Sequence, residues 1–157
     1  MNSALMFSKA SDEWATPQDF YSRIFDEFGC TIDAAATEAN TKCDIWYGPG
    51  SEIGEDSLAL DWSFLSDQPH WLNPPYSRCK EFMAKAAAER LRGVLTVALV
   101  PARTDTRWFH DHLWGQNEYG EGCPQAGIEL RFVRGRLKFG DGKNSAPFPS
   151  LVVVFRP

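Results

Sequence analysis

The sequence lacks the marks of metal-binding, membrane and secreted proteins. Its four cysteines are scattered without a Cys-x-x-Cys pair, and the three histidines do not complete a zinc set. We therefore expect reduced thiols and no metal site. No stretch reaches the roughly 18 apolar residues of a membrane helix, and the first residues lack the basic start and long apolar middle of a secretion signal. These absences predict a cytoplasmic protein without a membrane partner.

Positive charge is scarce in the first part of the chain. Residues 1–70 hold three Lys or Arg against thirteen Asp or Glu, a net charge of −10. Residues 71–157 hold thirteen Lys or Arg against eight Asp or Glu, a net charge of +5. Such an asymmetry is typical of a protein that meets a polyanion with one side. The alternative is that both parts carry ordinary solvated surface charge.

Length and composition predict one packed domain. The chain has 157 residues, of which 43% are hydrophobic, and it contains six tryptophans. This is enough for a central sheet covered by helices. We expect residues 1–13 to form a mobile N-terminal lead and residues 14–157 to form the domain.

Periodicity along the chain predicts alternating helices and strands. Helices are expected over residues 19–28, 80–92 and 106–113. Strands are expected over residues 30–33, 44–47, 58–62, 94–100, 128–133, 136–139 and 150–155. Thr16 is a candidate N-cap of the first helix, with Pro17 in its first turn, and Arg134-Gly135 would close a hairpin. This order favours an α/β fold with a doubly wound, Rossmann-like mixed sheet that ends in an antiparallel hairpin.

The tetrapeptide Asn73-Pro74-Pro75-Tyr76 is the most informative motif. Its two prolines fix φ near about −65° and donate no backbone N–H, so the segment is a stiff ledge of carbonyl oxygens. Asn73 Oδ1 and the Pro74 carbonyl can accept the two hydrogens of a planar amine, while Tyr76 stacks on its ring. The structural alternative is that these residues only form a turn after a strand.

An amine held by this ledge would be activated. The lone pair of an exocyclic base amine is delocalised into the ring, and acceptors placed out of the ring plane favour a pyramidal nitrogen that can attack a positioned electrophile. In duplex DNA the base must first turn out of the stack. Asp33 and the ledge at Asn73 both fall at strand ends, and α/β sheets bind ligands at the carboxyl ends of their strands.

An ordered series of motifs spans residues 14 to 155. It consists of Trp14-Ala15-Thr16-Pro17, Ile32-Asp33-Ala34-Ala35-Ala36 with Asn40, Asp56-Ser57-Leu58 with Trp62, Asn73-Pro74-Pro75-Tyr76, Pro101, Asp105-Thr106, Trp108-Phe109 and Gly135-Arg136-Leu137-Lys138-Phe139. With this series the chain resembles the phage-type DNA N-6-adenine methyltransferase (Dam) family, whose members use S-adenosylmethionine.

The resemblance implies a methyl transfer from S-adenosylmethionine to a flipped-out adenine in double-stranded DNA. Asn73, Pro74 and Tyr76 would grip adenine N6, and Pro75 would stiffen the turn. The residues that would border the cofactor are Trp14, Thr16, Pro17, Asp33, Ala34, Ala35 and Asp56. Asp33 would attract the cationic amino-acid portion of the cofactor, whereas Asp56 would serve either cofactor or adenine. The residues that would meet DNA phosphates are Arg78, Lys80, Arg134, Arg136 and Lys138.

Alternatives remain open at this stage. Thr16 and Pro17 could only cap a helix, Asp33 could be an ordinary strand-end acid, and the hairpin cations could be solvated edge charges. The methyl acceptor could instead be a protein glutamine amide or an RNA base amine, and a catalytically idle DNA-binding protein is a third option. The alanines after Asp33 depart from the glycine-rich cofactor turn of many methyltransferases. Site recognition would fall to loops 37–57, 103–127 and 140–149, with a homodimer as a further option.

Overall fold

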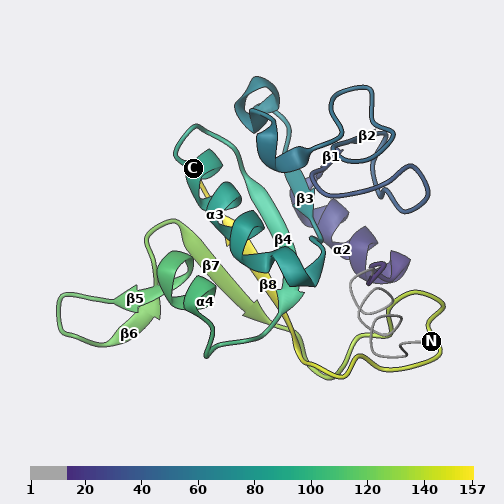
Figure 1. Cartoon of the computed structure of the whole chain (residues 1–157). Helices are drawn as coiled ribbons and strands as arrows, with labels where there is room; N and C mark the ends of the chain where they lie inside the picture. The colour runs from purple at the N-terminus through teal and green to yellow at the C-terminus, as the bar shows by residue number, and fades with distance from the viewer. Residues whose placement is uncertain (1–13) are drawn as a thin grey trace, which may run out of the picture.

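The computed structural model describes residues 14–157, which form a mixed α/β domain (Figure 1). The expected N-terminal lead, residues 1–13, lies outside the described residues. The helices are α2 (Gln18–Phe28), α3 (Cys79–Arg90) and α4 (Arg107–His112), with short 3-10 helices at Ser57–Ala59, Trp62–Leu65 and Tyr76–Arg78. The strands are β1 (Ile32–Asp33), β2 (Ile45–Trp46), β3 (His70–Leu72), β4 (Thr96–Pro101), β5 (Trp114–Gln116), β6 (Gly122–Pro124), β7 (Ile128–Phe132) and β8 (Ser150–Phe155).

The six-stranded sheet has the order β2-β1-β3-β4-β8-β7. Strands β2, β1, β3 and β4 are mutually parallel, and β8 runs antiparallel to both β4 and β7. Asp33 is in register with Trp71, and Trp71 is in register with Val97. The carboxyl ends of β1, β3 and β4 therefore meet at one edge of the sheet. Strands β5 and β6 form a separate antiparallel pair that projects from the body (Figure 1).

Helices cover both faces of the sheet. On one face, α2 packs its Phe20 and Ile24 into a cluster with Trp71 and Val97 of neighbouring strands. On the other face, α3 and α4 pack against Leu72, Ala98, Val100, Leu151 and Val153. Strand β4 is buried along its whole length, which explains its continuous apolar run without polar alternation. The expectation of a mixed sheet with helices on both sides is confirmed.

The strand predicted over residues 58–62 is wrong. This stretch instead contains the 3-10 helix Ser57–Ala59, followed by a second one that begins at Trp62. Asp56 caps the first by accepting a hydrogen bond from Leu58 N (3.1 Å), and Asp61 caps the second in the same way. Aspartates at this spacing offer the backbone a local turn in place of a strand ladder.

The hairpin predicted around Arg134-Gly135 is also wrong in its second strand. Strand β7 pairs with β8, and residues 133–149 form a long connection between them. Phe139 is buried in the cluster on the α2 side, so the chain crosses the sheet edge instead of returning along β7. The sheet does end in an antiparallel pair, but its strands are β7 and β8, not the two strands of the expected hairpin.

Candidate active site

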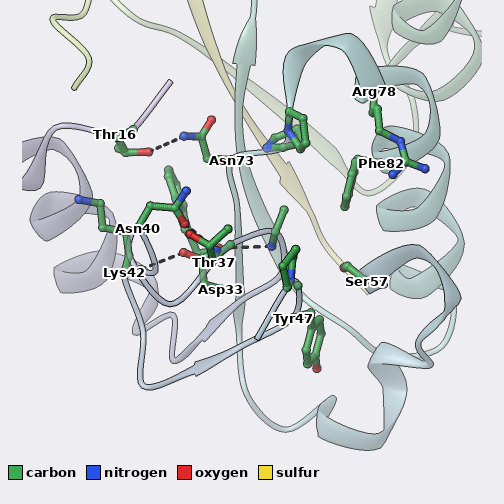
Figure 2. A pocket seen from close by; sticks show the side chains of 18 of the residues that line it. Thr16, Asp33, Thr37, Asn40, Lys42, Tyr47, Ser57, Asn73, Arg78 and Phe82 are labelled. Atoms are coloured by element: carbon green, nitrogen blue, oxygen red, sulfur yellow. Dashed lines mark hydrogen bonds between the residues drawn. The ribbon is translucent and has the colours of Figure 1, made fainter. Parts of the chain in front are cut away.

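A cavity of about 650 Å³ opens at the carboxyl ends of β1 and β3 (Figure 2). The segments that line it are residues 14–16, 33–42 in part, 47–49, 55–57, 71, 73–75, 78 and 82. Asp33, which ends β1, and Asn73, which follows the neighbouring strand β3, both line it. The two strand ends thus border one cavity, since adjacent parallel strands deliver their last residues to one place; that the cavity holds a ligand stays a prediction.

Asn73 lines this cavity and has a side-chain oxygen without a hydrogen-bond partner in the described residues. Its side-chain nitrogen donates to the Trp14 carbonyl (2.5 Å) and to Thr16 Oγ1 (3.0 Å), the second contact being drawn in Figure 2. Its Oδ1 is buried and has no hydrogen-bond partner within the described residues. Leaving a buried acceptor unpaired costs about 1–3 kcal/mol. A ligand N–H placed there would recover that cost.

The prolines after Asn73 shape the rim. Pro74 is buried and Pro75 half-buried, and both line the cavity. The Pro75 carbonyl is used inside the turn, where it accepts from Arg78 N (2.9 Å). Pro75 thereby begins the 3-10 helix Tyr76–Arg78, and the Pro74 carbonyl is the proline acceptor that remains for a ligand.

Tyr76 lies beside the cavity rather than on its wall. Its ring meets Phe139 (centroids 6.3 Å apart) and Phe148 (5.4 Å), in both cases edge to face. Its hydroxyl is buried without a hydrogen-bond partner among residues 14–157, and burial raises the pKa of Tyr76. The stacking of Tyr76 on a bound base stays a prediction.

Removing the Tyr76 hydroxyl should be harmless, whereas removing the ring should not. Tyr76→Phe deletes a buried group that makes no hydrogen bond with residues 14–157, so melting temperature and turnover should stay near wild type. Tyr76→Ala takes the ring away from Phe139 and Phe148, at a cost of about 3 kcal/mol in unfolding free energy. Urea unfolding and turnover of both variants check this. Equal turnover in the two variants would show that the Tyr76 ring does not contribute to the reaction.

Asp33 ties the loop behind β1 to the sheet. Its Oδ1 accepts from Ala35 N (3.3 Å) and its Oδ2 from Lys42 N (2.9 Å), so one carboxylate holds both ends of this loop. Burial raises the pKa of Asp33 to about 7, against the lowering effect of these two backbone hydrogen bonds and of the Lys42 charge. The carboxyl is 3% exposed and borders the cavity. It therefore combines a structural role with a position facing a ligand.

The alanine turn after Asp33 lies close to the backbone of a glycine that follows the neighbouring strand. Gly48 follows β2 with φ +146°, and a Cβ built there would lie 1.9 Å from the Ala36 carbonyl oxygen. Tyr47 on its other side donates its N–H to the Asp33 carbonyl (2.9 Å) and accepts from Ala36 N (3.1 Å). Any side chain at Gly48 would push this turn away from β2.

Tyr47 is anchored in the core beneath the cavity. Its hydroxyl is 3.0 Å from His70 Nε2, and His70 Nδ1 is 2.9 Å from the Gln68 carbonyl. Because a carbonyl only accepts, Nδ1 donates and Nε2 accepts from Tyr47. Burial lowers the pKa of His70 to about 4, so the ring is neutral at pH 7. This pair holds Tyr47 in place under the loop.

Of the remaining predicted cofactor residues, some line the cavity and others lie behind its wall. Asp56 is exposed, lines the cavity and caps the following 3-10 helix. Ala34 is fully buried and lies outside the wall, where its carbonyl accepts from Ser57 Oγ. Pro17 also lies outside the wall. It occupies the N-cap position of α2, so the prediction of Thr16 as the N-cap is wrong: the Thr16 hydroxyl contacts Asn73 instead.

The predicted phosphate-binding residues lie near this edge of the sheet. Arg78 lines the cavity with its guanidinium 5.9 Å from the Phe82 ring centroid, and Lys80 is exposed in the first turn of α3. Arg134, Arg136 and Lys138 are exposed, and no ion pair of theirs occurs within the described residues.

The connection that carries these three cations emerges at the same edge as Asn73. Strand β7 is antiparallel to β8, and β8 is antiparallel to β4, so β7 ends where β4 and β3 end. In Figure 1 the connection, in yellow-green, runs along the lower side of the sheet towards α2. The connection therefore places unpaired positive charge beside the cavity.

Sequence reasoning missed part of the wall. Lys42, Tyr47, Gly48, Trp71 and Phe82 all line the cavity. The first three fall in a stretch rich in Gly, Asn, Ser and Asp that was expected to be a DNA-reading loop. The available signal was the aromatic-glycine pair directly after the short strand β2, because a glycine there indicates close backbone approach.

Residues 14–157 contain neither a membrane-spanning helix nor a cluster of metal-binding side chains. None of the helices in this part is long and apolar enough to cross a bilayer. This same part holds no group of three or more His, Cys, Asp or Glu side chains arranged to bind a metal ion.

Comparison with known proteins gives consistent matches. A family model described as "DNA N-6-adenine-methyltransferase (Dam)" matches residues 4–157. A DNA N-6-adenine-methyltransferase of Escherichia phage T1 is 31% identical over 99 residues, which cover 62% of this chain and 39% of that protein. A protein of the same description from Haemophilus phage HP1 (strain HP1c1) is 25% identical over 166 residues, covering 96% of this chain and 83% of that protein.

Proposed function

The chain belongs to the DNA N-6-adenine-methyltransferase (Dam) family, and on this premise we propose that it methylates N6 of an adenine turned out of double-stranded DNA, with S-adenosylmethionine as methyl donor. Asn73, which lines the cavity and whose buried Oδ1 has no partner within residues 14–157, carries this proposal. We assign the fold to the Rossmann-like methyltransferases. Since both relatives are phage proteins, we place the activity in the cytoplasm of a host cell.

The rim offers two acceptors to a planar amine. Asn73 Oδ1 and the Pro74 carbonyl would each take one N6 hydrogen, which draws the nitrogen lone pair out of conjugation with the ring. Preorganised acceptors also stabilise the positive charge that develops on the nitrogen. Neither group accepts a hydrogen bond from the described residues that would have to be broken first.

The cavity suits S-adenosylmethionine in size and charge. Its volume of about 650 Å³ lies within the usual range of ligand pockets. Asp33, Glu55 and Asp56 line it and would face the cationic groups of the cofactor, while Trp14 and Phe82 offer apolar surface. When bound, the cofactor supplies an electrophilic methyl group on a sulfonium. The chain would contribute the relative placement of the two reactants, since the acceptors for the amine and the acidic residues for the cofactor border one cavity.

Cofactor affinity should depend on pH through Asp33. Its pKa of about 7 stands well above the ordinary value of 3.8, because burial disfavours the charged form. The raised pKa stabilises the folded state in acid, and this contribution is lost as the pH rises through about 7. A cationic ligand favours the ionised carboxylate, so its affinity should fall by up to about tenfold for each pH unit below 7.

Calorimetric titration of S-adenosylmethionine across this pH range checks the effect. Asp33→Asn keeps the size of the side chain and removes the titrating group, so its affinity should be weaker at neutral pH and nearly independent of pH. A wild-type affinity that stays constant from acid to neutral pH would show that Asp33 does not bind the cationic part of the cofactor.

The basic connection is proposed to hold the DNA backbone. Arg78 and Lys80 flank the amine rim, and Arg134, Arg136 and Lys138 lie on the connection whose Phe139 and Phe148 contact Tyr76. Exposed cations without ion-pair partners are free to neutralise phosphates. The acidic first part of the chain would then face the cofactor and the basic second part the DNA.

Methylation of plasmid DNA that lacks adenine methylation tests the proposal. The protein is incubated with labelled S-adenosylmethionine and equal masses of duplex DNA, RNA and total protein, and the products are separated and digested. Label in N6-methyladenine from DNA, absent with Asn73→Ala, is the expected result. Label in RNA or in protein glutamine would overturn the DNA assignment, and DNA retention without any transfer would indicate an idle binder.

A further inference from the structure

The amide of Asn73 is held by acceptors from a distant segment of the chain. The Trp14 carbonyl lies 2.5 Å and Thr16 Oγ1 3.0 Å from Asn73 Nδ2, across a sequence separation of more than fifty residues. Figure 2 shows the Thr16 hydroxyl facing this nitrogen, while the amide oxygen of Asn73 points away. The segment and the rim thus meet through one amide group.

This arrangement allows a single orientation of the amide. A backbone carbonyl can only accept a hydrogen bond, so the group that faces Trp14 must be the NH₂. Turning the amide over would place Oδ1 of Asn73 against the Trp14 carbonyl, two acceptors at the 2.5 Å now spanned by a hydrogen bond. The oxygen is thereby directed to the other side, where it is buried and has no partner among residues 14–157.

The holding segment is itself fixed from behind. The Ala15 carbonyl accepts from Gly140 N (3.0 Å), and the Trp14 ring meets Phe139 (5.6 Å between centroids) and Phe148 (5.2 Å) edge to face. Thr16 is 4% exposed and directly precedes the N-cap of α2. The two acceptors are consequently not free to follow the Asn73 side chain if it rotates.

We propose that Thr16 is a positioning residue for Asn73, acting together with the Trp14 carbonyl to keep Oδ1 aimed at the substrate amine. This inference rests on the proposed function and changes the role expected for Thr16, which borders the cofactor cavity but serves the acceptor side of the reaction. It also makes residue 73 specific for asparagine, because a carboxylate has no hydrogen to give to Trp14.

Thr16→Val and Thr16→Ser form a matched pair for the test. Valine keeps the shape and removes the hydroxyl, whereas serine keeps the hydroxyl. Thr16→Val should lower kcat by roughly three- to tenfold, the value of one neutral hydrogen bond, while the cofactor Kd stays within about twofold of wild type. Thr16→Ser should restore kcat. A rise in cofactor Kd at unchanged kcat, or equal kcat in both variants, would overturn the positioning role.

A second measurement does not need turnover. The side-chain NH₂ resonances of Asn73, assigned by their absence in Asn73→Ala, should shift in Thr16→Val and return towards wild type in Thr16→Ser. Unchanged resonances in Thr16→Val would overturn the inference whatever the acceptor is. If the wild type methylates no DNA adenine but these shifts occur, the proposed function fails and the positioning of Asn73 stands.

Asn73→Asp provides a further test that does not depend on whether the Thr16 variants fold. In its ionised form, the carboxylate of this variant would meet the Trp14 carbonyl without a hydrogen between them, so turnover at neutral pH should be low. A protonated carboxyl can donate to Trp14 and still offer its other oxygen, so the ratio of variant to wild-type turnover should rise as the pH falls. A ratio that is high at neutral pH, or that falls in acid, would contradict the inference.

Discussion

Asn73→Ala is expected to lower turnover by roughly a hundred- to a thousandfold, the usual effect of removing one preorganised group that stabilises developing charge. The variant loses Oδ1, which is an acceptor at the cavity rim without a partner among the described residues. It also frees the Trp14 carbonyl and Thr16 Oγ1, which accept from the amide nitrogen in the wild type. The acidic wall formed by Asp33, Glu55 and Asp56 is untouched, so S-adenosylmethionine should bind within a few fold of wild type.

Single-turnover methylation with saturating cofactor measures the chemical effect, and calorimetry measures cofactor binding separately. Tyr76→Phe is the matched control beside the cavity, because it also removes one buried polar group without a partner within the described residues but keeps the ring that packs on Phe139 and Phe148. Near-normal turnover of Asn73→Ala would refute the assignment of Asn73 to the amine. A parallel loss of cofactor binding would show that the side chain supports the whole cavity.

Gly48→Ala is expected to lower the unfolding free energy by about 3 kcal/mol and to weaken cofactor binding severely. The new Cβ would lie 1.9 Å from the Ala36 carbonyl oxygen, and the position has φ +146°. The Ala36 carbonyl oxygen is a backbone atom and the new Cβ is bonded directly to the backbone, so no side-chain rotation can relieve the contact. The turn would have to leave β2, and the hydrogen bonds of Tyr47 to Asp33 and Ala36 would be lost with it.

Gly50→Ala is the control for backbone strain alone. Gly50 has φ +83°, and a Cβ built there meets no atom within 4 Å. Its cost should be about 1 kcal/mol, with cofactor binding close to wild type. Chemical unfolding and cofactor titration of both variants separate the two causes. Equal losses at the two positions would mean that strain, and not contact with Ala36, dominates at Gly48.

These two predictions describe the two halves of one cavity. The proposed acceptor half is a rigid turn in which asparagine and proline place lone pairs, and the proposed cofactor half is a loop held by Asp33 and by the approach of Gly48. The family match confirms the resemblance drawn from the motif series, and the roles of the individual residues remain to be tested by these variants.

The helices of the fold were predictable because their signals are local. The observed bounds of α2 and α3, Gln18–Phe28 and Cys79–Arg90, differ from expectation by one or two residues, since spacing of apolar residues and a following glycine act within a few turns. The apolar runs of β4 and β8 were equally clear. Pairing was not predictable: residues 136–139 have strand-like composition, yet the burial of Phe139 beside Trp14 takes them out of the sheet.

The sequence by itself determined the groups on which the proposed chemistry rests, because the stiffness of two adjacent prolines and the acceptor oxygens beside them are covalent properties of Asn73–Tyr76. It also determined the family, because the order of the motifs along the chain can be read without knowing any tertiary contact. Only the tertiary structure decided which distant residues the motif residues contact. Gly48 meets Ala36 because β1 and β2 pair in parallel, and Thr16 meets Asn73 because the segment before α2 lies against the residue that follows β3. No local pattern relates the residues of either contact. Contacts of that kind depend on the packing of the whole sheet, and therefore cannot be read from neighbouring residues alone.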